Sequence, residues 1–147
     1  MKRFVTIIAA FAVAGCGTMS PHCASNDAQG LVEVLRPEAQ FKSMLKGVVN
    51  RTQTAKMAAA KDGSAAGQKL DQAIDDAVER HAAEWKRNLV LSWQTLSPAE
   101  VEQVCTALEQ RDQQTFTRFA QRVGSKVQSR NEPLLRRSAV EVLDAVW

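Results

Sequence analysis

Two histidines, His22 and His81, are the side chains in this sequence best suited to accept a proton near neutral pH. A serine or cysteine hydrolase would need such a base beside its nucleophile, together with N–H donors for the oxyanion. His22 lies in a segment rich in Gly, Ser, Pro and Asn, whereas His81 falls on an apolar stripe without a nucleophile motif or Gly-rich turn. We therefore interpret His81 as a core or rim residue and predict that the protein is not an enzyme.

Carboxylates near His81 suggest a second chemistry, the binding of a metal ion. Glu84 lies three residues after His81, and Asp71, Asp75 and Glu79 share one face of the same expected helix. A di-metal site in a helical bundle uses a Glu three residues before a His, repeated on a second helix. Neither feature occurs here, so we interpret the carboxylates as a solvated acidic face and expect no metal and no cofactor.

The three cysteines are Cys16, Cys23 and Cys105. If Cys16 is modified, as its surroundings indicate below, Cys23 and Cys105 are the two remaining thiols and can pair in an oxidising compartment. Their disulfide would close a loop of 81 residues, positions 24 to 104, and would stabilise the fold by about 4 kcal/mol on a chain-entropy estimate. Cys105 also lies among aliphatic residues at helical spacing, which is typical of a small buried apolar side chain. The sequence leaves both interpretations open.

Four cations are spaced four residues apart, along one edge of an expected helix: Arg118, Arg122, Lys126 and Arg130. We refer to these four residues as the basic edge. Like charges at this spacing repel by roughly 0.2–0.5 kcal/mol per pair unless an anion lies nearby. The candidate anions are the acidic face named above, lipid headgroups and an acidic partner protein. The alternative is an ordinary solvated face.

The amino terminus has the composition of a bacterial signal sequence. Lys2 and Arg3 are basic, and residues 4–13 form an apolar run of ten residues with Thr6 as its one polar member. The run is too short to span a membrane, for which about 20 apolar residues are needed. It ends in Val13-Ala14-Gly15-Cys16.

Val13-Ala14-Gly15-Cys16 resembles the lipobox of bacterial lipoproteins, in which an aliphatic and two small residues precede a cysteine that receives lipid. The resemblance implies that residues 1–15 are removed and that acyl chains on Cys16 hold the protein permanently at a membrane. Gly17 stands where lipoproteins kept at the inner membrane of many Gram-negative bacteria carry Asp, which favours the outer membrane, facing the periplasm. An ordinary secretory signal is the alternative.

The remaining chain is divided into a tether and one domain. Residues 17–27 are rich in Gly, Ser, Pro, Asn and Asp, so we predict that residues 16–30 form a flexible tether and residues 31–147 a helical domain. Apolar residues make up 45% of the 147-residue chain, which suits a single folded core. Removal of Lys2 and Arg3 leaves 17 basic residues (19 − 2) against 16 acidic ones, so charge gives no reason to expect nucleic acid.

Composition and apolar spacing both indicate helices. Aromatic residues make up 5% of the chain and Tyr is absent, whereas strands draw on aromatic and β-branched side chains. From Leu31, apolar residues recur at intervals of three and four, which predicts two short helices, or one kinked at Pro37, over residues 31–49. A long helix over about 65–95 follows a break at residues 61–64, with Ser64 as a candidate N-cap.

The second half contains the clearest local signal. Ser97-Pro98-Ala99-Glu100 can form a capping box with proline at the first helical position. A further helix should start after Arg111-Asp112, and a last one at Asn131-Glu132-Pro133. Trp85, Trp93 and Trp147 are expected to be core anchors, with Trp93 or Trp147 available for an interface if exposed. The predicted fold is all-α, a single compact array of about five or six helices.

A second resemblance concerns residues 31–49 and Leu96-Ser97-Pro98-Ala99-Glu100-Val101. Their layout is similar to a family of uncharacterised bacterial periplasmic helical domains, in which a Leu-rich opening helix and a long middle helix precede such a helix start. That family continues with an aromatic residue and a Ser-Pro-x-Gly stretch, which residues 112–119 lack. The resemblance implies a helical fold and no activity.

Two functions are compatible with these observations. The first is a membrane-anchored periplasmic lipoprotein that binds or scaffolds another envelope protein without catalysing a reaction. The second is an immunity protein, which would neutralise a toxic effector acting in the periplasm.

Overall fold

The structure, a computed structural model, describes residues 21–146. The predicted signal peptide, the lipidation of Cys16 and the role of Trp147 lie outside the described residues. Within them the chain forms a compact all-α array of six helices, as predicted: α1 (Ala28–Val34), α2 (Pro37–Asn50), α3 (Gln53–Asp62), α4 (Ser64–Trp93), α5 (Pro98–Glu109) and α6 (Gln113–Val146). None of the described helices has both the length and the apolar character needed to cross a bilayer.

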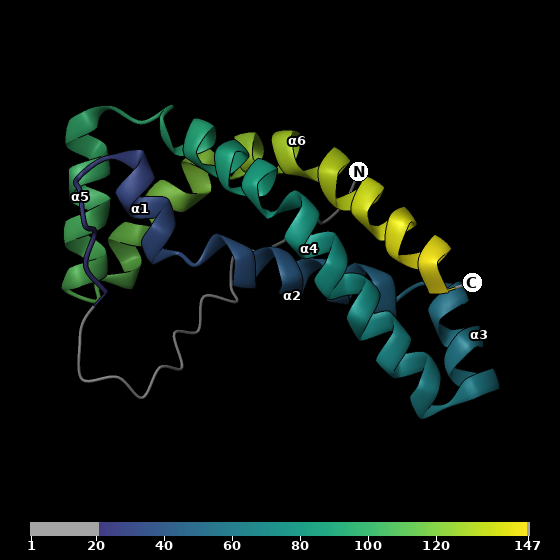
Figure 1. The fold of residues 1–147 in the computed structure, drawn as a ribbon. Coiled ribbons are helices and arrows are strands. Elements are labelled where there is room, and N and C mark those ends of the chain that lie inside the picture. The colour runs from purple at the N-terminus through teal and green to yellow at the C-terminus, as the bar shows by residue number, and fades with distance from the viewer. Residues whose placement is uncertain (1–20, 147) are drawn as a thin grey trace, which may run out of the picture.

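The two long helices, α4 and α6, form the axis of the molecule (Figure 1). They run antiparallel, because Glu84 of α4 meets Arg137 of α6 while the later Asn88 meets the earlier Asn131. Helix α2 packs against both. Figure 1 shows α1 and α5 at one end of the elongated array and α3 with the end of α6 at the other. We call these the α5 end and the α3 end.

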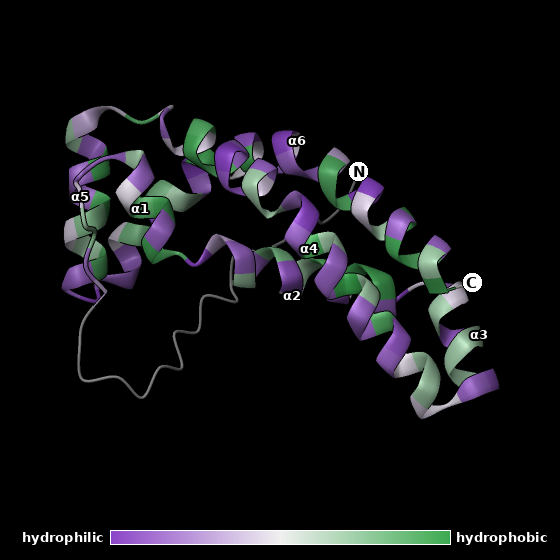
Figure 2. Cartoon of the chain, in the orientation of Figure 1, coloured by the Kyte–Doolittle hydropathy of each residue, from purple (hydrophilic) through white to green (hydrophobic). Residues whose placement is uncertain are grey.

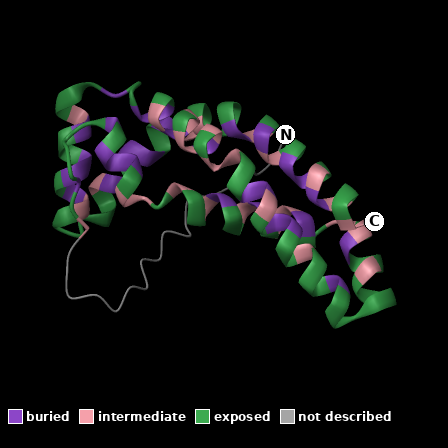
Figure 3. Ribbon diagram, viewed as in Figure 1, coloured by how far each residue is buried: buried purple, intermediate pink, exposed green. Residues whose placement is uncertain are grey.

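One continuous apolar core joins the six helices. Figure 2 shows hydrophobic and hydrophilic residues alternating along α4 and α6, and Figure 3 shows the buried residues following one side of each helix. Trp85 of α4 and Phe41 of α2 are fully buried and their rings stack with centroids 4.7 Å apart. The predicted stripe of α4 is thus the face that meets the core.

Local capping signals fix two helix starts where the sequence predicted them. The Ser97 side chain accepts a hydrogen bond from the Glu100 N–H, and Glu100 accepts one from the Ser97 N–H, so the capping box is confirmed. At the next junction Arg111 adopts a left-handed conformation and Asp112 accepts the N–H of Thr115, which starts α6. Both starts depend on contacts within a few residues.

The first helix begins at Ala28, inside the segment 16–30 predicted to be a flexible tether. The Asp27 carboxylate accepts the Gly30 N–H at 2.8 Å and thereby caps α1. Leu31 and Val32 of that helix are fully buried. The chain then breaks at Arg36, whose φ of 52° is left-handed, and Pro37 starts α2. Residues 31–49 therefore form two helices rather than one kinked helix.

Ser64 is not an N-cap. Helix α3 runs to Asp62, and Gly63, with φ 57° and ψ −124°, joins it to α4, so that Ser64 is already the first residue of α4. A side chain is strained at this φ, and glycine is not.

The break predicted at Asn131-Glu132-Pro133 is wrong, because α6 continues through Pro133 to Val146. Proline removes one N–H from the helix at a cost of about 3 kcal/mol. Packing against α4 offsets this cost: Leu134 is buried, and the Asn88 amide donates to the Asn131 side chain at 3.0 Å. Figure 1 shows that the two halves of α6 run in different directions, as expected for a helix kinked at proline.

Phe41→Ala should lower the free energy of unfolding by about 3–5 kcal/mol, because it leaves a cavity against the Trp85 ring. Urea unfolding followed by circular dichroism measures this change. Val140→Ala is the matched control, since Val140 is 57% exposed and its truncation should change stability by less than about 0.5 kcal/mol. Equal losses in the two variants would contradict this description of the core.

Candidate interaction surfaces

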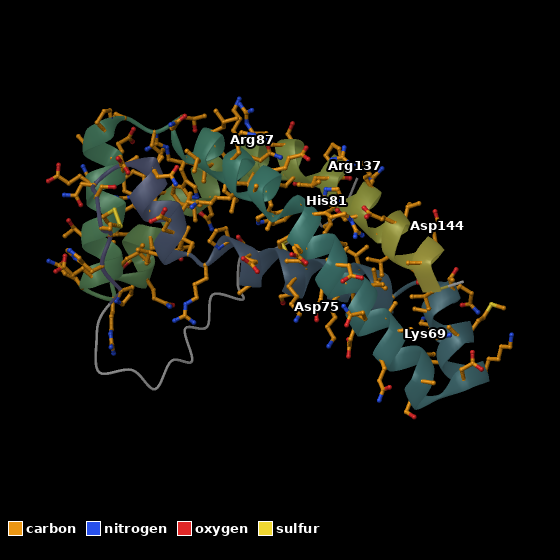
Figure 4. The ribbon with its side chains drawn as sticks, in the orientation of Figure 1. Lys69, Asp75, His81, Arg87, Arg137 and Asp144 are labelled. Atoms are coloured by element: carbon orange, nitrogen blue, oxygen red, sulfur yellow. A yellow bond between two sulfur atoms is a disulfide. The ribbon has the colours of Figure 1, made fainter. Side chains whose placement is uncertain are left out.

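Cys23 and Cys105 form a disulfide, so of the two interpretations left open by the sequence the structure contains the bonded one. Their Cα atoms are 5.8 Å apart and both residues are buried within the apolar core. Figure 4 shows the sulfur–sulfur bond beside α5. The bond attaches the segment that precedes α1 covalently to the middle of α5. Residue 23 is therefore a fixed part of the domain, seven positions after Cys16.

The basic edge lies on the first half of α6, and all four of its side chains are exposed. Arg122 forms an ion pair with Glu100 of α5, and the guanidinium groups of Arg118 and Arg122 lie 5.0 and 5.5 Å from the centre of the Phe119 ring. The Ser97 N–H and then Arg122 hold the pKa of Glu100 below its ordinary value. Arg122 therefore helps to hold α6 on α5.

The other members of the basic edge form no ion pair among the described residues. Lys126 and Arg130 have no carboxylate partner in this part of the chain, whereas Arg118 lies over the Phe119 ring. Hydrogen bonds from Thr115 and then the charge of Arg118 lower the pKa of Asp112. The acidic face of α4, one of the candidate partners that the sequence offered, forms no ion pair with the basic edge in the described residues, so that candidate is wrong. Asp75 lies 2.6 Å from Lys42, and Asp71 lies 3.4 Å from Lys46, both lysines belonging to α2.

His81 is partly buried and belongs to the contact between α4 and α6, close to Arg137 in Figure 4. Its Nε2 lies 2.6 Å from Oε2 of Glu141, and Arg80 forms an ion pair with the same carboxylate. Hydrogen bonding from His81 and then from Arg80 lowers the pKa of Glu141 against the opposing effect of its burial. This is the rim position expected for His81, with a partner on the neighbouring helix.

Glu84, the carboxylate nearest to His81 in sequence, pairs with Arg137 at 2.9 Å rather than with His81. Within residues 21–146 no three side chains of the metal-ligating types gather in one place. Trp85 and Trp93 are buried, and Trp93 packs against Phe116 with centroids 6.1 Å apart. Trp93 is therefore a core residue and is not available for an interface.

A groove of about 300 Å³ opens at the α3 end, between α3, the start of α4 and the end of α6. Alanine and glycine make up half of its lining, with Leu70, Leu143 and Val146 among the larger apolar residues. Met57 of α3 is 51% exposed. Figure 3 shows that the α3 end is largely exposed around this groove. Only the alanine-rich composition of residues 55–66 hinted at this groove.

A wider and shallower hollow of about 690 Å³ lies between the α1–α2 turn and α4. Its two lysines are both paired, Lys86 with Glu33 at 3.1 Å and Lys42 with Asp75. The two lysines of this hollow thus help to hold α1 and α2 on α4.

No protein-family model, curated protein or solved structure matches the chain. The resemblances to lipoproteins and to periplasmic helical domains therefore stay predictions.

Glu141→Gln should destabilise the protein near neutral pH, because it removes the ion pair with Arg80 and the bond with His81. The pKa of Glu141 is lowered from 4.5, so its contribution is present above that pH and is lost as the pH falls through the lower folded value. Unfolding free energies measured at about pH 7 and about pH 3 should show the difference from wild type shrinking in acid.

The matched control for this experiment is Asp144→Asn, which changes a carboxylate on the same helix that has no ion pair among the described residues. It should change the unfolding free energy little at either pH. A difference between Glu141→Gln and wild type that stays constant down to about pH 3 would contradict the assignment.

Proposed function

We propose that the protein is a lipid-anchored module of the bacterial envelope that binds another protein without catalysing a reaction. Its acyl chains would be carried by Cys16, and it would face the periplasm from the outer membrane. The groove at the α3 end is the observation that carries the binding part of this proposal, and the disulfide supports export.

The disulfide supports export because such bonds persist in oxidising compartments such as the periplasm. Cys23 and Cys105 are both only 4% exposed, and they join segments 82 positions apart in sequence. A protein that depends on this bond is suited to a compartment outside the cytoplasm. The same reasoning agrees with the lipobox-like residues that precede Cys16.

The groove at the α3 end supports a protein partner. Interface centres are depleted in charged residues, and exposed methionine is common on surfaces that accept apolar side chains of a partner. Ala58 and Ala59 are accessible and contribute little bulk to the lining, so a helix can approach the backbone of α3 closely. We infer that the occupant is an amphipathic helix of the partner, which would lay its apolar side chains in the groove.

Its position also suits binding. Figure 1 places α3 at the opposite end of the array from α5, which bears the disulfide. Helix α4, with 30 residues, is about 45 Å long. A partner bound at the α3 end would thus be held away from the anchored end.

Ala59→Trp should abolish partner binding, because a large ring at this groove-lining position fills the space that the partner needs. The measurement is cross-linked recovery of partners from envelope extract with the full-length, membrane-extracted protein. Recovery should fall about tenfold or more, as expected when the centre of an interface is lost. The identity of the recovered protein separates the two functions: a secreted toxin or hydrolase indicates immunity, and a resident envelope protein indicates a scaffold.

Two control variants accompany this experiment. Ala60→Trp adds the same ring at an exposed position on the same helix that does not line the groove, and it should leave recovery unchanged. Arg118→Glu with Arg130→Glu reverses charge on the basic edge and spares the ion pair of Arg122. Loss of the partner in this double variant, with normal recovery by Ala59→Trp, would place the partner on the basic edge and refute the groove.

A further inference from the structure

We propose that the basic edge is a lipid-binding surface: Arg118, Arg122, Lys126 and Arg130 lie on the anionic headgroups of the membrane that holds Cys16. This inference rests on the proposed lipidation of Cys16. It assigns an occupant to the charged surface and fixes which end of the molecule faces the bilayer.

The first step is the length of the tether. Cys16 and Cys23 are seven residues apart, which corresponds to at most about 25 Å of fully extended chain. Cys23 cannot move away from α5, because it is bonded to Cys105. Because the Cα atoms of Cys23 and Cys105 are 5.8 Å apart, the middle of α5 is never more than about 31 Å from the lipidated residue. Without the disulfide, the whole segment before α1 would add to this reach.

The second step is the position of the basic edge relative to the disulfide. Arg122 is ion-paired with Glu100, which lies five residues before Cys105 on α5, about 7.5 Å along the helix axis. The basic edge extends for 12 residues from Arg118 to Arg130, about 18 Å along α6. The surface that contains the four cations thus starts beside the anchored helix and lies within reach of the bilayer.

The third step is charge. Residues 113–131 contain the four cations of the basic edge and no carboxylate. Within the described chain Arg122 is the one member that forms an ion pair, and Arg118 is influenced by the charge of Asp112, whereas Lys42, Lys86 and Arg137 on other surfaces are each paired. Basic side chains beside a lipid anchor strengthen membrane binding when the bilayer is negatively charged. The anchor already confines these side chains to the bilayer surface, which raises their effective concentration there.

Three other unpaired cations lie far from the anchor, whereas Arg87 and Arg111, which also lack an ion pair in the described residues, lie toward the α5 end. Lys56, Lys61 and Lys69 form no ion pair in the described residues, but they belong to α3 and the start of α4. Lys69 lies 24 residues before Trp93, the last residue of α4, which is about 36 Å along the helix axis. Figure 4 shows Lys69 beside α3, far from Arg87 near the other end of α4. Tether length therefore excludes these three lysines, and the grouping of four cations on one helix distinguishes the basic edge from the single residues Arg87 and Arg111.

Amine footprinting of the lipidated full-length chain in vesicles tests this proposal. Lys126 reports on the basic edge, and Lys61 and Lys69 report on the α3 end in the same sample. In vesicles that contain phosphatidylglycerol, modification of Lys126 should fall about fivefold or more relative to phosphatidylcholine vesicles, the effect of about one cation held at an anionic surface. Lys61 and Lys69 should be modified equally in both, and 1 M salt should restore Lys126.

The variant Arg118→Glu with Arg130→Glu keeps Lys126 as the reporter and the Arg122–Glu100 ion pair intact. Its Lys126 should react equally in the two kinds of vesicle. Equal modification in the wild type, or protection of Lys61 and Lys69 in place of Lys126, would overturn the proposal. If Lys126 is protected only when envelope extract is added, and equally in both kinds of vesicle, the proposal is also overturned, and the basic edge binds an acidic protein instead.

The two proposals fail in distinguishable ways. A chain without acyl chains on Cys16 would be recognised by its mass and would overturn both the anchoring and this inference. A lipidated chain in which Lys126 is modified equally in phosphatidylglycerol and phosphatidylcholine vesicles would overturn this inference alone.

Discussion

The antiparallel packing of α4 against α6 is the interaction on which the rest of the structure depends. The apolar stripe of α4 supplies Trp85 to the centre of the core, and α2 covers both long helices. Polar contacts along the rim set the register, since Glu141 meets Arg80 and His81 while Arg137 meets Glu84. Ion pairs at the surface contribute little to stability, so the apolar core provides most of the free energy and the rim pairs select one alignment.

The disulfide fixes which end of the helical array lies next to the preceding chain. Without it, the segment before α1 would be held only by the packing of α1, whereas the Cys23–Cys105 bond attaches this segment covalently to α5. The charged surface and the apolar groove lie at different ends of the array. The basic edge lies near the α5 end, and the alanine-lined groove lies at the other. This separation supports the proposal of a module that is anchored at one end and binds a partner at the other.

Features that depend on neighbouring residues could be predicted from the sequence, and features that depend on distant ones could not. The capping box at Ser97 and the stripe of α4 are local patterns, and both were predicted correctly. Pro133 was misread as a helix start because its cost is offset by packing against α4, which no local pattern reveals. The pairing of Asp75 on the solvated acidic face was not predicted, because its partner, Lys42, lies on another helix. The groove was missed because the alanines of α3 give no apolar periodicity.

The account depends most directly on a lipidated Cys16 placed seven residues before a cysteine that is bonded to α5. Peptide mapping by mass spectrometry, on protein extracted from membranes without reduction, tests both parts at once. The account predicts a chain that starts at Cys16 with acyl chains attached, and a linkage between Cys23 and Cys105 that is lost on reduction. An unmodified Cys16, or Cys23 recovered as a free thiol, would contradict it.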